Sequence, residues 1–272
     1  HWKKSHSGPN RAGVRDTAQM LGYNSTSYGT GFADVYDDWY GDVTDVAATV
    51  SRMVGLVGLV GLVDPASPVL ELGAGTGRLA IPLAQAGLSV TAVDSSREML
   101  DQLHALDPDG SVTVVHGDMV EDLPDGPFAA ALIAYNTIFN LLGNGAQQAC
   151  FAAVAARLAP DGVFVVEAFV PESDTPAGSD ISVRSMAVDR VVLSVSQTTP
   201  SSQQAEGQFI EITEAGGVRL RPWSVRWATP EQLDAMATAA GLVLDARHAD
   251  MAGTPFDSES AQHVSVYRRP IG

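Results

Sequence analysis

The stretch VLELGAGTGR (residues 69–78) is the strongest indication of the fold of this chain. It is an apolar run typical of a buried strand, leading into a turn with Gly73, Gly75 and Gly77 and then into a helical pattern. Glycines at such a turn let the backbone come close to a ligand. Asp94 ends the next strand-like run, seventeen residues after Gly77, where a carboxylate can accept hydrogen bonds from two ribose hydroxyls. These two features predict a nucleoside-binding site.

Strand-like and helical patterns alternate on both sides of this turn. LSVTAVD (residues 88–94) and GVFVVEAF (residues 162–169) are typical of strands, whereas SREMLDQLHAL (residues 96–106) has a helical pattern. This alternation predicts a parallel sheet with crossover helices and a ligand crevice at the carboxyl edge of its strands. Ser95 with Glu98 predicts a capping box at the start of the second helix.

The pattern changes after Pro171. Residues 181–227 show strand-like alternation interrupted by turn clusters, which predicts an antiparallel meander. Thr229, Pro230 and Gln232 then predict a capped helix to about residue 240, and two final strands near residues 242–247 and 263–268 complete the sheet. We therefore divide the chain into a tail, expected to be disordered (1–28), a helical cap (29–64), a core (65–171 and 228–272) and an antiparallel β insertion acting as a substrate or oligomer lid (172–227).

Charge and composition limit the kind of partner. The net charge is −16, and the first 15 residues hold four cations and no acid, so the remaining chain carries −20. Such a surface disfavours nucleic acid as a substrate and favours a small neutral or cationic molecule. The longest apolar run, residues 53–63, is about half the roughly 20 residues of a membrane span. With Cys150 as the only cysteine, we expect no disulfide and a cytoplasmic protein that binds no membrane, with a homodimer as one state that the sequence allows.

The glycine spacing distinguishes between two kinds of nucleoside ligand. Dinucleotide sites use G-x-G-x-x-G, whereas this turn has G-x-G-x-G followed by Arg78. Glu71, two residues before the first glycine, is a poor neighbour for a pyrophosphate and a good partner for an α-amino group. The turn therefore favours a nucleoside that carries an amino acid.

At these residues the chain resembles the class I S-adenosylmethionine-dependent methyltransferases. The matching motifs are ELGAGTGR (residues 71–78) and VDSSREML (residues 93–100). The resemblance implies a Rossmann-like α/β fold, in which a seven-stranded, mostly parallel sheet has helices on both faces. It also implies S-adenosyl-L-methionine as cofactor. The residues expected to bind it are Tyr36, Tyr40, Glu71, Gly73, Ala74, Gly75, Gly77, Asp94, Ser95, Met99, Gly117, Asp118, Met119, Tyr135 and Asn136.

A narrower resemblance concerns FADVYDDWY (residues 32–40), which is similar to the N-terminal helix of deoxyaminosugar N,N-dimethyltransferases of antibiotic biosynthesis. Those enzymes also carry an antiparallel insertion after the fifth strand. The resemblance implies N-methylation of an amino group in a small, aminosugar-like product of secondary metabolism. Tyr36 and Tyr40 lie on one helical face, from which aromatic rings could shield a sulfonium.

The residues that act on the acceptor are harder to predict. We expect His248 and Asn136 to be catalytic, with His263, Glu167 and Asp250 as further candidate bases. Asn140, Arg226 and Trp227 are expected to line the substrate pocket. No carboxylate cluster follows the fourth strand, so no metal is predicted. An O-methyltransferase, a nucleotide-binding oxidoreductase and a non-catalytic cofactor-binding protein stay as alternatives.

Overall fold

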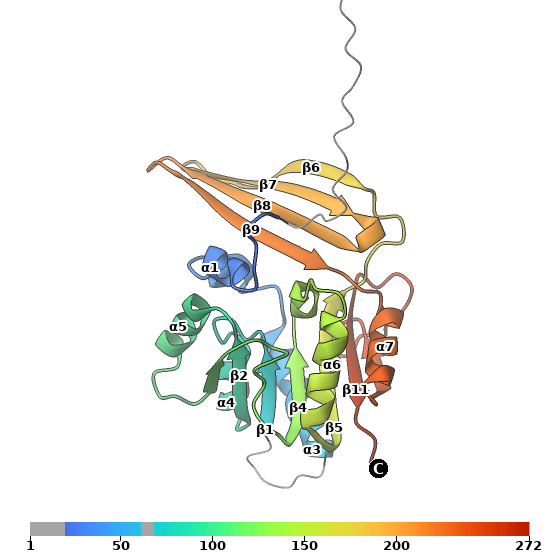
Figure 1. Cartoon of the computed structure of the whole chain (residues 1–272). Helices are drawn as coiled ribbons and strands as arrows, with labels where there is room; N and C mark the ends of the chain where they lie inside the picture. Colours follow the sequence, from blue (N-terminus) through green and yellow to red (C-terminus); the bar gives the residue numbers. More distant parts are fainter. Residues whose placement is uncertain (1–19, 61–67, 272) are drawn as a thin grey trace, which may run out of the picture.

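The computed structural model describes residues 20–60 and 68–271 and contains two sheets (Figure 1). The larger has seven strands in the order β10-β11-β5-β4-β1-β2-β3. Its strands are β1 (Pro68–Leu72), β2 (Ser89–Asp94), β3 (Thr113–His116), β4 (Phe128–Ile133), β5 (Leu158–Phe169), β10 (Val243–His248) and β11 (Gln262–Arg268). The first five are parallel, and β11 runs antiparallel to both of its neighbours. The predicted Rossmann-like α/β fold is confirmed.

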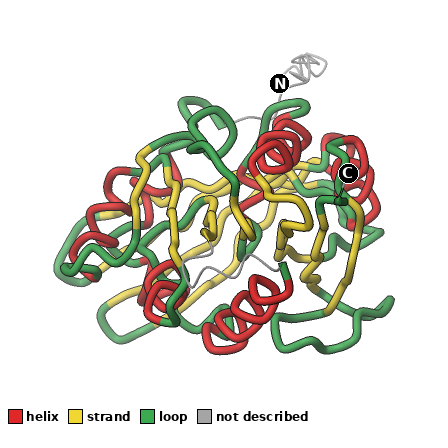
Figure 2. The backbone as a smooth tube through the Cα atoms, turned by 90° about the horizontal axis from the view of Figure 1, so that it is seen from below, coloured by secondary structure: helices red, strands yellow, loops and turns green. Residues whose placement is uncertain are grey.

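Helices cover both faces of this sheet (Figure 2). They are α3 (Val46–Leu59), α4 (Ala80–Gln85), α5 (Arg97–Leu106), α6 (Ala146–Arg157) and α7 (Pro230–Ala239). Strand β4, with the sequence FAAALI, is buried along its whole length because helices pack on each side of it. One core forms beneath α6 and α7, and the other beneath α3, α4 and α5.

Four antiparallel strands form a second sheet, which we call the lid: β6 (Gly178–Met186), β7 (Arg190–Thr199), β8 (Gln204–Thr213) and β9 (Val218–Arg226), with the short helix η2 (Pro200–Ser202) between β7 and β8. The lid lies beyond the carboxyl ends of the parallel strands (Figure 1). Two short helices, α1 (Ser27–Phe32) and α2 (Tyr36–Tyr40), lie between the lid and the larger sheet.

Buried charges join the lid to these helices. The guanidinium of Arg221 on β9 is only 1% exposed and donates to the Gly31 carbonyl at 2.7 Å. It also pairs with Asp34 at 2.7 Å and with Glu211 at 2.6 Å. Arg219 contacts the same Asp34 carboxylate at 2.9 Å from a more exposed position. The segment between α1 and α2 is therefore tied to the inner face of the lid.

Two local expectations need correction. The N-cap of α5 is Ser96 rather than Ser95, because the Ser96 hydroxyl accepts from the Met99 N–H. The expected tail also ends earlier than predicted, because α1 begins at Ser27 and the Met20 N–H donates to Glu206 of the lid at 2.6 Å. The rest of the predicted tail, residues 1–19, lies outside the described residues, as do residues 61–67. The capping box of Thr229 and Gln232 is confirmed.

Candidate active site

A pocket lies at the carboxyl edge of β1, β2 and β4, beneath α1. A 3₁₀ turn, η1 (Thr137–Asn140), follows β4 and forms one of its walls. The pocket is lined by Tyr23, Asn24, Ser25, Tyr28, Gly29, Tyr36, Gly73, Gly75, Asp94, Ser95, Ser96, Met99, Asp118, Met119, Thr137, Asn140 and Leu141. This is the edge at which open parallel sheets bind ligands.

The glycine turn leaves room that a side chain would fill. Gly73 has φ +66°, and a Cβ atom there would come within 2.3 Å of Thr137 Cγ2, so the turn and η1 touch directly. Gly75 has φ +58°, and a Cβ atom there would project between Met99 and Tyr36, both of which line the pocket. The absence of a side chain at Gly75 therefore opens the pocket to a ligand that approaches the backbone.

Asp94 is held beside this turn by backbone hydrogen bonds. Its Oδ2 accepts from the Gly75 N–H at 2.8 Å and its Oδ1 from the Ser96 N–H at 2.8 Å. The Ala74 N–H donates to the Val93 carbonyl at 3.1 Å, which fixes the turn to β2. Burial raises the pKa of Asp94, against the effect of the two N–H donors. Each carboxylate oxygen keeps a lone pair with which to accept from a ligand.

Two ionisable residues beside the glycine turn have buried polar atoms without partners in the described part of the chain. These atoms are Glu71 Oε2, and Nε and Nη1 of Arg78. Burial raises the pKa of Glu71 to about 8, and the nearby Arg78 guanidinium lowers it only in part. Unpaired buried charges are costly unless a ligand completes them. Neither residue lines the pocket itself, and Arg78 lines a separate hollow next to Asp37 and Ile81, but both flank the glycine turn whose Gly73 and Gly75 do line it. A carboxylate and a guanidinium at this turn match the ammonium and carboxylate of an amino acid, so these residues fit a methionine moiety.

Aromatic side chains from α1 and α2 close the pocket. Tyr36 lines it and lies close enough to the Arg78 guanidinium for that charge to lower the Tyr36 pKa, against the larger effect of burial, whereas Tyr40 is buried behind it. The Tyr40 ring lies 5.2 Å from that of Tyr36 and 6.0 Å from that of Tyr135, measured between centroids. Tyr40 and Tyr135 therefore support the wall of the pocket behind Tyr36.

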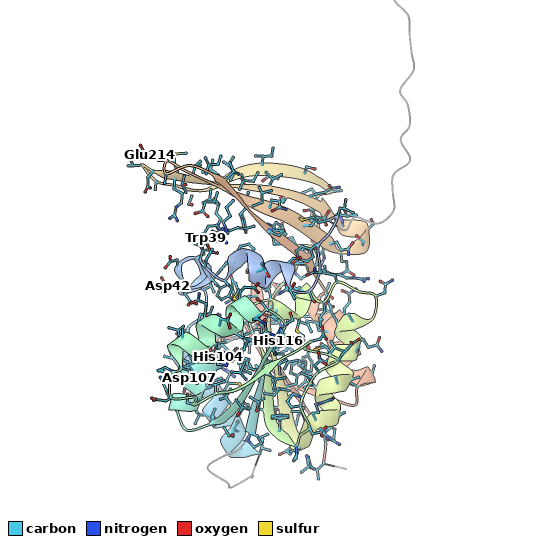
Figure 3. The ribbon with its side chains drawn as sticks, turned by 60° about the vertical axis from the view of Figure 1, so that its left-hand side comes forward. Trp39, Asp42, His104, Asp107, His116 and Glu214 are labelled. Carbon is cyan, nitrogen blue, oxygen red and sulfur yellow. The ribbon has the colours of Figure 1, made fainter. Side chains whose placement is uncertain are left out.

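A cation lies in an aromatic cage next to this wall. The Arg184 guanidinium carbon is 4.5 Å from the ring centroid of Phe209, 4.9 Å from that of Trp39 and 5.3 Å from that of Tyr40. Arg184 comes from β6, at a register shift that interrupts the alternation of side chains. Figure 3 shows Trp39 between the N-terminal helices and the lid. We call Trp39, Tyr40 and Phe209 the aromatic cage.

Asn136 and Glu167 meet at the ends of β4 and β5. Asn136 Oδ1 accepts from the Phe169 N–H at 2.7 Å, so this side chain holds the backbone instead of facing a ligand. Glu167 Oε2 accepts from the Tyr135 N–H at 2.9 Å, and burial raises the pKa of Glu167. Of the four candidate bases, Glu167 is the one at the carboxyl edge beside the pocket.

The other candidate bases lie elsewhere. His248 is on β10, which is separated from β1 by β11, β5 and β4, a distance of about 19 Å in strand spacing. His263 is fully buried on β11 next to Ser265, and burial lowers its pKa to about 4. The carboxylate of Asp250 accepts from Gly253 and Thr254 within its own loop. The structure thus places none of the three at the pocket.

Several other predicted residues have local structural contacts. A Cβ atom on Gly77 would come within 2.7 Å of Leu103, and one on Gly117 within 2.5 Å of Asp122, so both glycines permit close packing. Arg226 Nη1 donates to Asn144 and to the Leu142 carbonyl, and Arg226 and Trp227 line a separate pocket between α6 and α7. The predicted pocket residues Ser95, Met99, Asp118, Met119 and Asn140 do line the main pocket.

Sequence reasoning missed two parts of the site. Arg78 had a signal, because it directly follows the glycine turn, but the spacing argument used it only to exclude a dinucleotide. Residues 23–29 carry no local signal of a pocket, and they reach it because Gly29 packs on Ser96, where a Cβ atom would come within 2.2 Å of Ser96 Cβ.

Comparison with known proteins agrees with this geometry. A family model described as a methyltransferase domain matches residues 69–162. The chain is 31% identical to the cypemycin N-terminal methyltransferase of a Streptomyces species, over 74% of this chain and 82% of the relative. It is 29% identical to the dTDP-3-amino-3,6-dideoxy-alpha-D-glucopyranose N,N-dimethyltransferase of Streptomyces fradiae, over 80% and 86%. The solved structure of the CcbJ methyltransferase from Streptomyces caelestis is similar with a TM-score of 0.81 and 37% identity, over 91% of this chain and 100% of that one.

Proposed function

The chain belongs to the class I S-adenosylmethionine-dependent methyltransferases, and we propose that it methylates an amino group of a small natural product. The methyl donor is S-adenosylmethionine, which supplies an electrophilic methyl group on a sulfonium when it is bound. In our proposal the acceptor is aminosugar-like. The first listed relatives act on amines by their names, one on a peptide N-terminus and one on an aminosugar, which supports an amine acceptor without selecting between these two classes.

Three charged residues would orient the donor. Glu71 would pair with its ammonium, Arg78 with its carboxylate, and Asp94 with its ribose hydroxyls. The proposal rests on the unpartnered buried atoms of Glu71 and Arg78 and on the lone pairs that Asp94 keeps. Tyr36 would lie over the methionine end, since it reaches both the pocket and Arg78.

The aromatic cage is the observation that carries the choice of an amine. Its three rings already surround a cation, the Arg184 guanidinium, at 4.5 to 5.3 Å. Attraction of a cation to such rings is worth about 0.5 to 1 kcal/mol per exposed contact. A protonated amine is the acceptor group that gains this attraction, whereas a neutral hydroxyl does not. In our proposal the acceptor amine approaches through this cage, and Arg184 moves with the lid to admit it.

Catalysis would depend mainly on alignment. Holding the amine nitrogen, methyl carbon and sulfur in line accounts for much of the acceleration of such a displacement. An amine whose pKa lies two to three units above neutrality costs about 3 to 4 kcal/mol to deprotonate. We assign the proton acceptor to Glu167, in place of His248, because Glu167 lies beside Tyr135 at the carboxyl edge and burial raises its pKa.

Paired acceptors test the proposal. A panel of aminosugars, including nucleotide-linked ones, and short peptides with free N-termini is compared with analogues in which a hydroxyl replaces the amine. Release of S-adenosylhomocysteine is measured for each pair. We expect turnover with at least one amine and none with its hydroxyl analogue. Turnover of hydroxyl acceptors alone would establish the O-methyltransferase alternative and overturn our assignment.

A further inference from the structure

A second pocket lies between α6 and α7, where β9 leaves the lid (Figure 1). Its volume of about 370 Å³ lies within the range of small-molecule sites, about 300 to 1,000 Å³. Although the chain has a net charge of −16, none of the residues that line this pocket is acidic. Its large polar and aromatic side chains are Gln147, Gln148, Gln203, Arg226, Trp227 and Gln232. We call it the amide pocket.

One end of the amide pocket is the N-terminus of α6, where positive charge has no counter-charge. The N-cap, Gly145, has no side chain, and the first turn contains no acid. In the described part of the chain, the N–H groups of Gln147 and Gln148 have no hydrogen-bond partner. Arg226 Nη1 donates to Asn144 Oδ1 at 2.6 Å, which brings the guanidinium to the same end of the helix. A cation at the positive end of a helix is unfavourable, so this arrangement favours the binding of an anion.

A buried carboxamide indicates a second kind of ligand group. Gln147 lines the amide pocket, is only 5% exposed, and donates from Nε2 to the Arg226 carbonyl at 2.7 Å. Its Oε1 has no partner among the described residues, and an amide oxygen left unpaired inside a protein is costly, so a ligand that donates to it is favoured. On the α7 side, Gln203 and Gln232 hold each other through amide hydrogen bonds of 2.8 and 3.1 Å. Each of their amide nitrogens carries a second N–H.

We propose that the amide pocket binds a sugar phosphate, with the phosphate at the N-terminus of α6 and the sugar hydroxyls along the glutamines. Backbone N–H groups and a guanidinium are the donors that bind phosphate. Nε and Nη2 of Arg226 bond to no described residue, so both can donate to it. A hydroxyl both donates and accepts, as a carboxamide does, which matches the sugar to Gln147, Gln203 and Gln232. A free phosphate would fill only a small part of this volume.

The amide pocket is next to the cofactor pocket but distinct from it. Leu141 lines the cofactor pocket and Gly143 lines the amide pocket. Two residues span at most about 7 Å, so the chain between η1 and α6 separates the two sites. A ligand in the amide pocket therefore does not occupy the place of S-adenosylmethionine. The inference goes beyond the proposed function, because it requires no particular acceptor atom.

A titration with glucose 1-phosphate tests the proposal in the intact chain. The indole N–H of Trp227 is observed by NMR in ¹⁵N-labelled protein and identified by its loss in Trp227→Phe. We expect its signal to shift saturably with glucose 1-phosphate, whereas glucose and inorganic phosphate should each bind at least about tenfold more weakly. An indole signal that does not move would overturn the proposal. Equal binding of inorganic phosphate would overturn the role of the glutamines.

A variant that supports the helix but occupies the anion site makes the test sharper. Gln148→Glu places a carboxylate in the first turn of α6, where it stabilises a helix, so the melting temperature should not fall. It should weaken binding of glucose 1-phosphate at least about tenfold, because the new carboxylate takes the place of the phosphate. The matched control is Gln102→Glu, which adds the same charge at an exposed position of α5 and should leave binding unchanged.

Arg226→Gln should also weaken binding, by about ten- to a hundredfold, as expected for the loss of charged hydrogen bonds. All three variants should retain their affinity for S-adenosylhomocysteine, which shows that they are folded. Binding of glucose 1-phosphate that survives both Gln148→Glu and Arg226→Gln would place the ligand elsewhere and overturn the proposal. These outcomes do not depend on which acceptor the enzyme methylates.

Discussion

Gly75 determines at the residue scale whether the cofactor can approach the backbone. Position 75 requires glycine for two reasons. Its φ of +58° is a conformation that only glycine adopts readily, and the absence of a side chain leaves the space between Met99 and Tyr36 empty. The two requirements can be separated experimentally, since other glycines of the chain share the conformation without facing the pocket.

We predict that Gly75→Ala lowers the affinity for S-adenosylhomocysteine more than tenfold. The matched control is Gly110→Ala, with φ +65° and nothing within 4 Å of the added Cβ. Both substitutions should cost a similar backbone strain of about 1 to 2 kcal/mol. Calorimetric titration and thermal unfolding of each variant check this. Equal affinity losses in the two would show that strain, rather than occupancy of the pocket, is the cause.

Glu71 should couple cofactor binding to proton release. Its pKa of about 8 in the free protein keeps it mostly protonated at neutral pH. An ammonium paired with the carboxylate lowers this pKa, so binding expels the proton and affinity rises with pH below about 8. The rise can reach tenfold per pH unit.

Titrations between pH 6 and 7.5, in buffers of different ionisation enthalpy, measure the released proton. Glu71→Gln should remove both the release and the pH dependence. A Glu71→Gln protein that retained the slope would place the titrating group elsewhere.

At the scale of elements, buried charges hold the lid and the two N-terminal helices against each other. Arg221 is the centre of that contact, with its guanidinium shared between Asp34, Glu211 and the Gly31 carbonyl. Arg219 offers a comparison, because it reaches the same Asp34 from a side chain that is 55% exposed.

We predict that Arg221→Leu destabilises the fold by about 3 to 5 kcal/mol, because the buried Glu211 carboxylate then keeps only the longer, partly exposed contact with Arg190 at 3.4 Å. Arg219→Leu should cost less than about 1 kcal/mol, as expected for an exposed ion pair. Chemical denaturation of both variants measures the difference. Similar losses would mean that the buried network does not hold the lid.

The aromatic cage gives a second prediction at this scale. Phe209→Leu removes one ring from around the cation site. It should raise KM for an amine acceptor about two- to fivefold, as expected from the loss of about 0.5 to 1 kcal/mol. Affinity for S-adenosylhomocysteine should stay the same, and Phe209→Tyr should restore KM. A change in cofactor affinity instead would assign Phe209 to the cofactor pocket.

Elements differed in how far the sequence could predict them. The glycine turn, Asp94 and the capped helix at Thr229 depend on residues close together in the chain, and their local spacing was sufficient. The cap of α5 was displaced by one residue, because Ser95 and Ser96 are both good caps and only the backbone selects Ser96. The sequence could not predict that residues 23–29 line the pocket, because their position depends on tertiary contacts with α5.

At the scale of the whole molecule, strand order limits what a sequence reveals about catalysis. The alternation of strands and helices in the sequence predicts a parallel sheet, but not that β11 lies between β5 and β10. That arrangement puts His248 at the far edge of the sheet and leaves Glu167 beside the pocket. The family, the fold and the donor are established from motifs and comparisons, whereas our proposal for the acceptor rests on the aromatic cage between the lid and α2.

The acceptor atom is tested most directly by following the methyl carbon itself. The chain is incubated with S-adenosylmethionine labelled with ¹³C in its methyl group and with an acceptor bearing both an amine and a hydroxyl. A two-dimensional NMR spectrum of the product then identifies the atom to which the labelled methyl is attached. Our account predicts a methyl group on nitrogen, with none on oxygen. A labelled methyl found only on oxygen would contradict it.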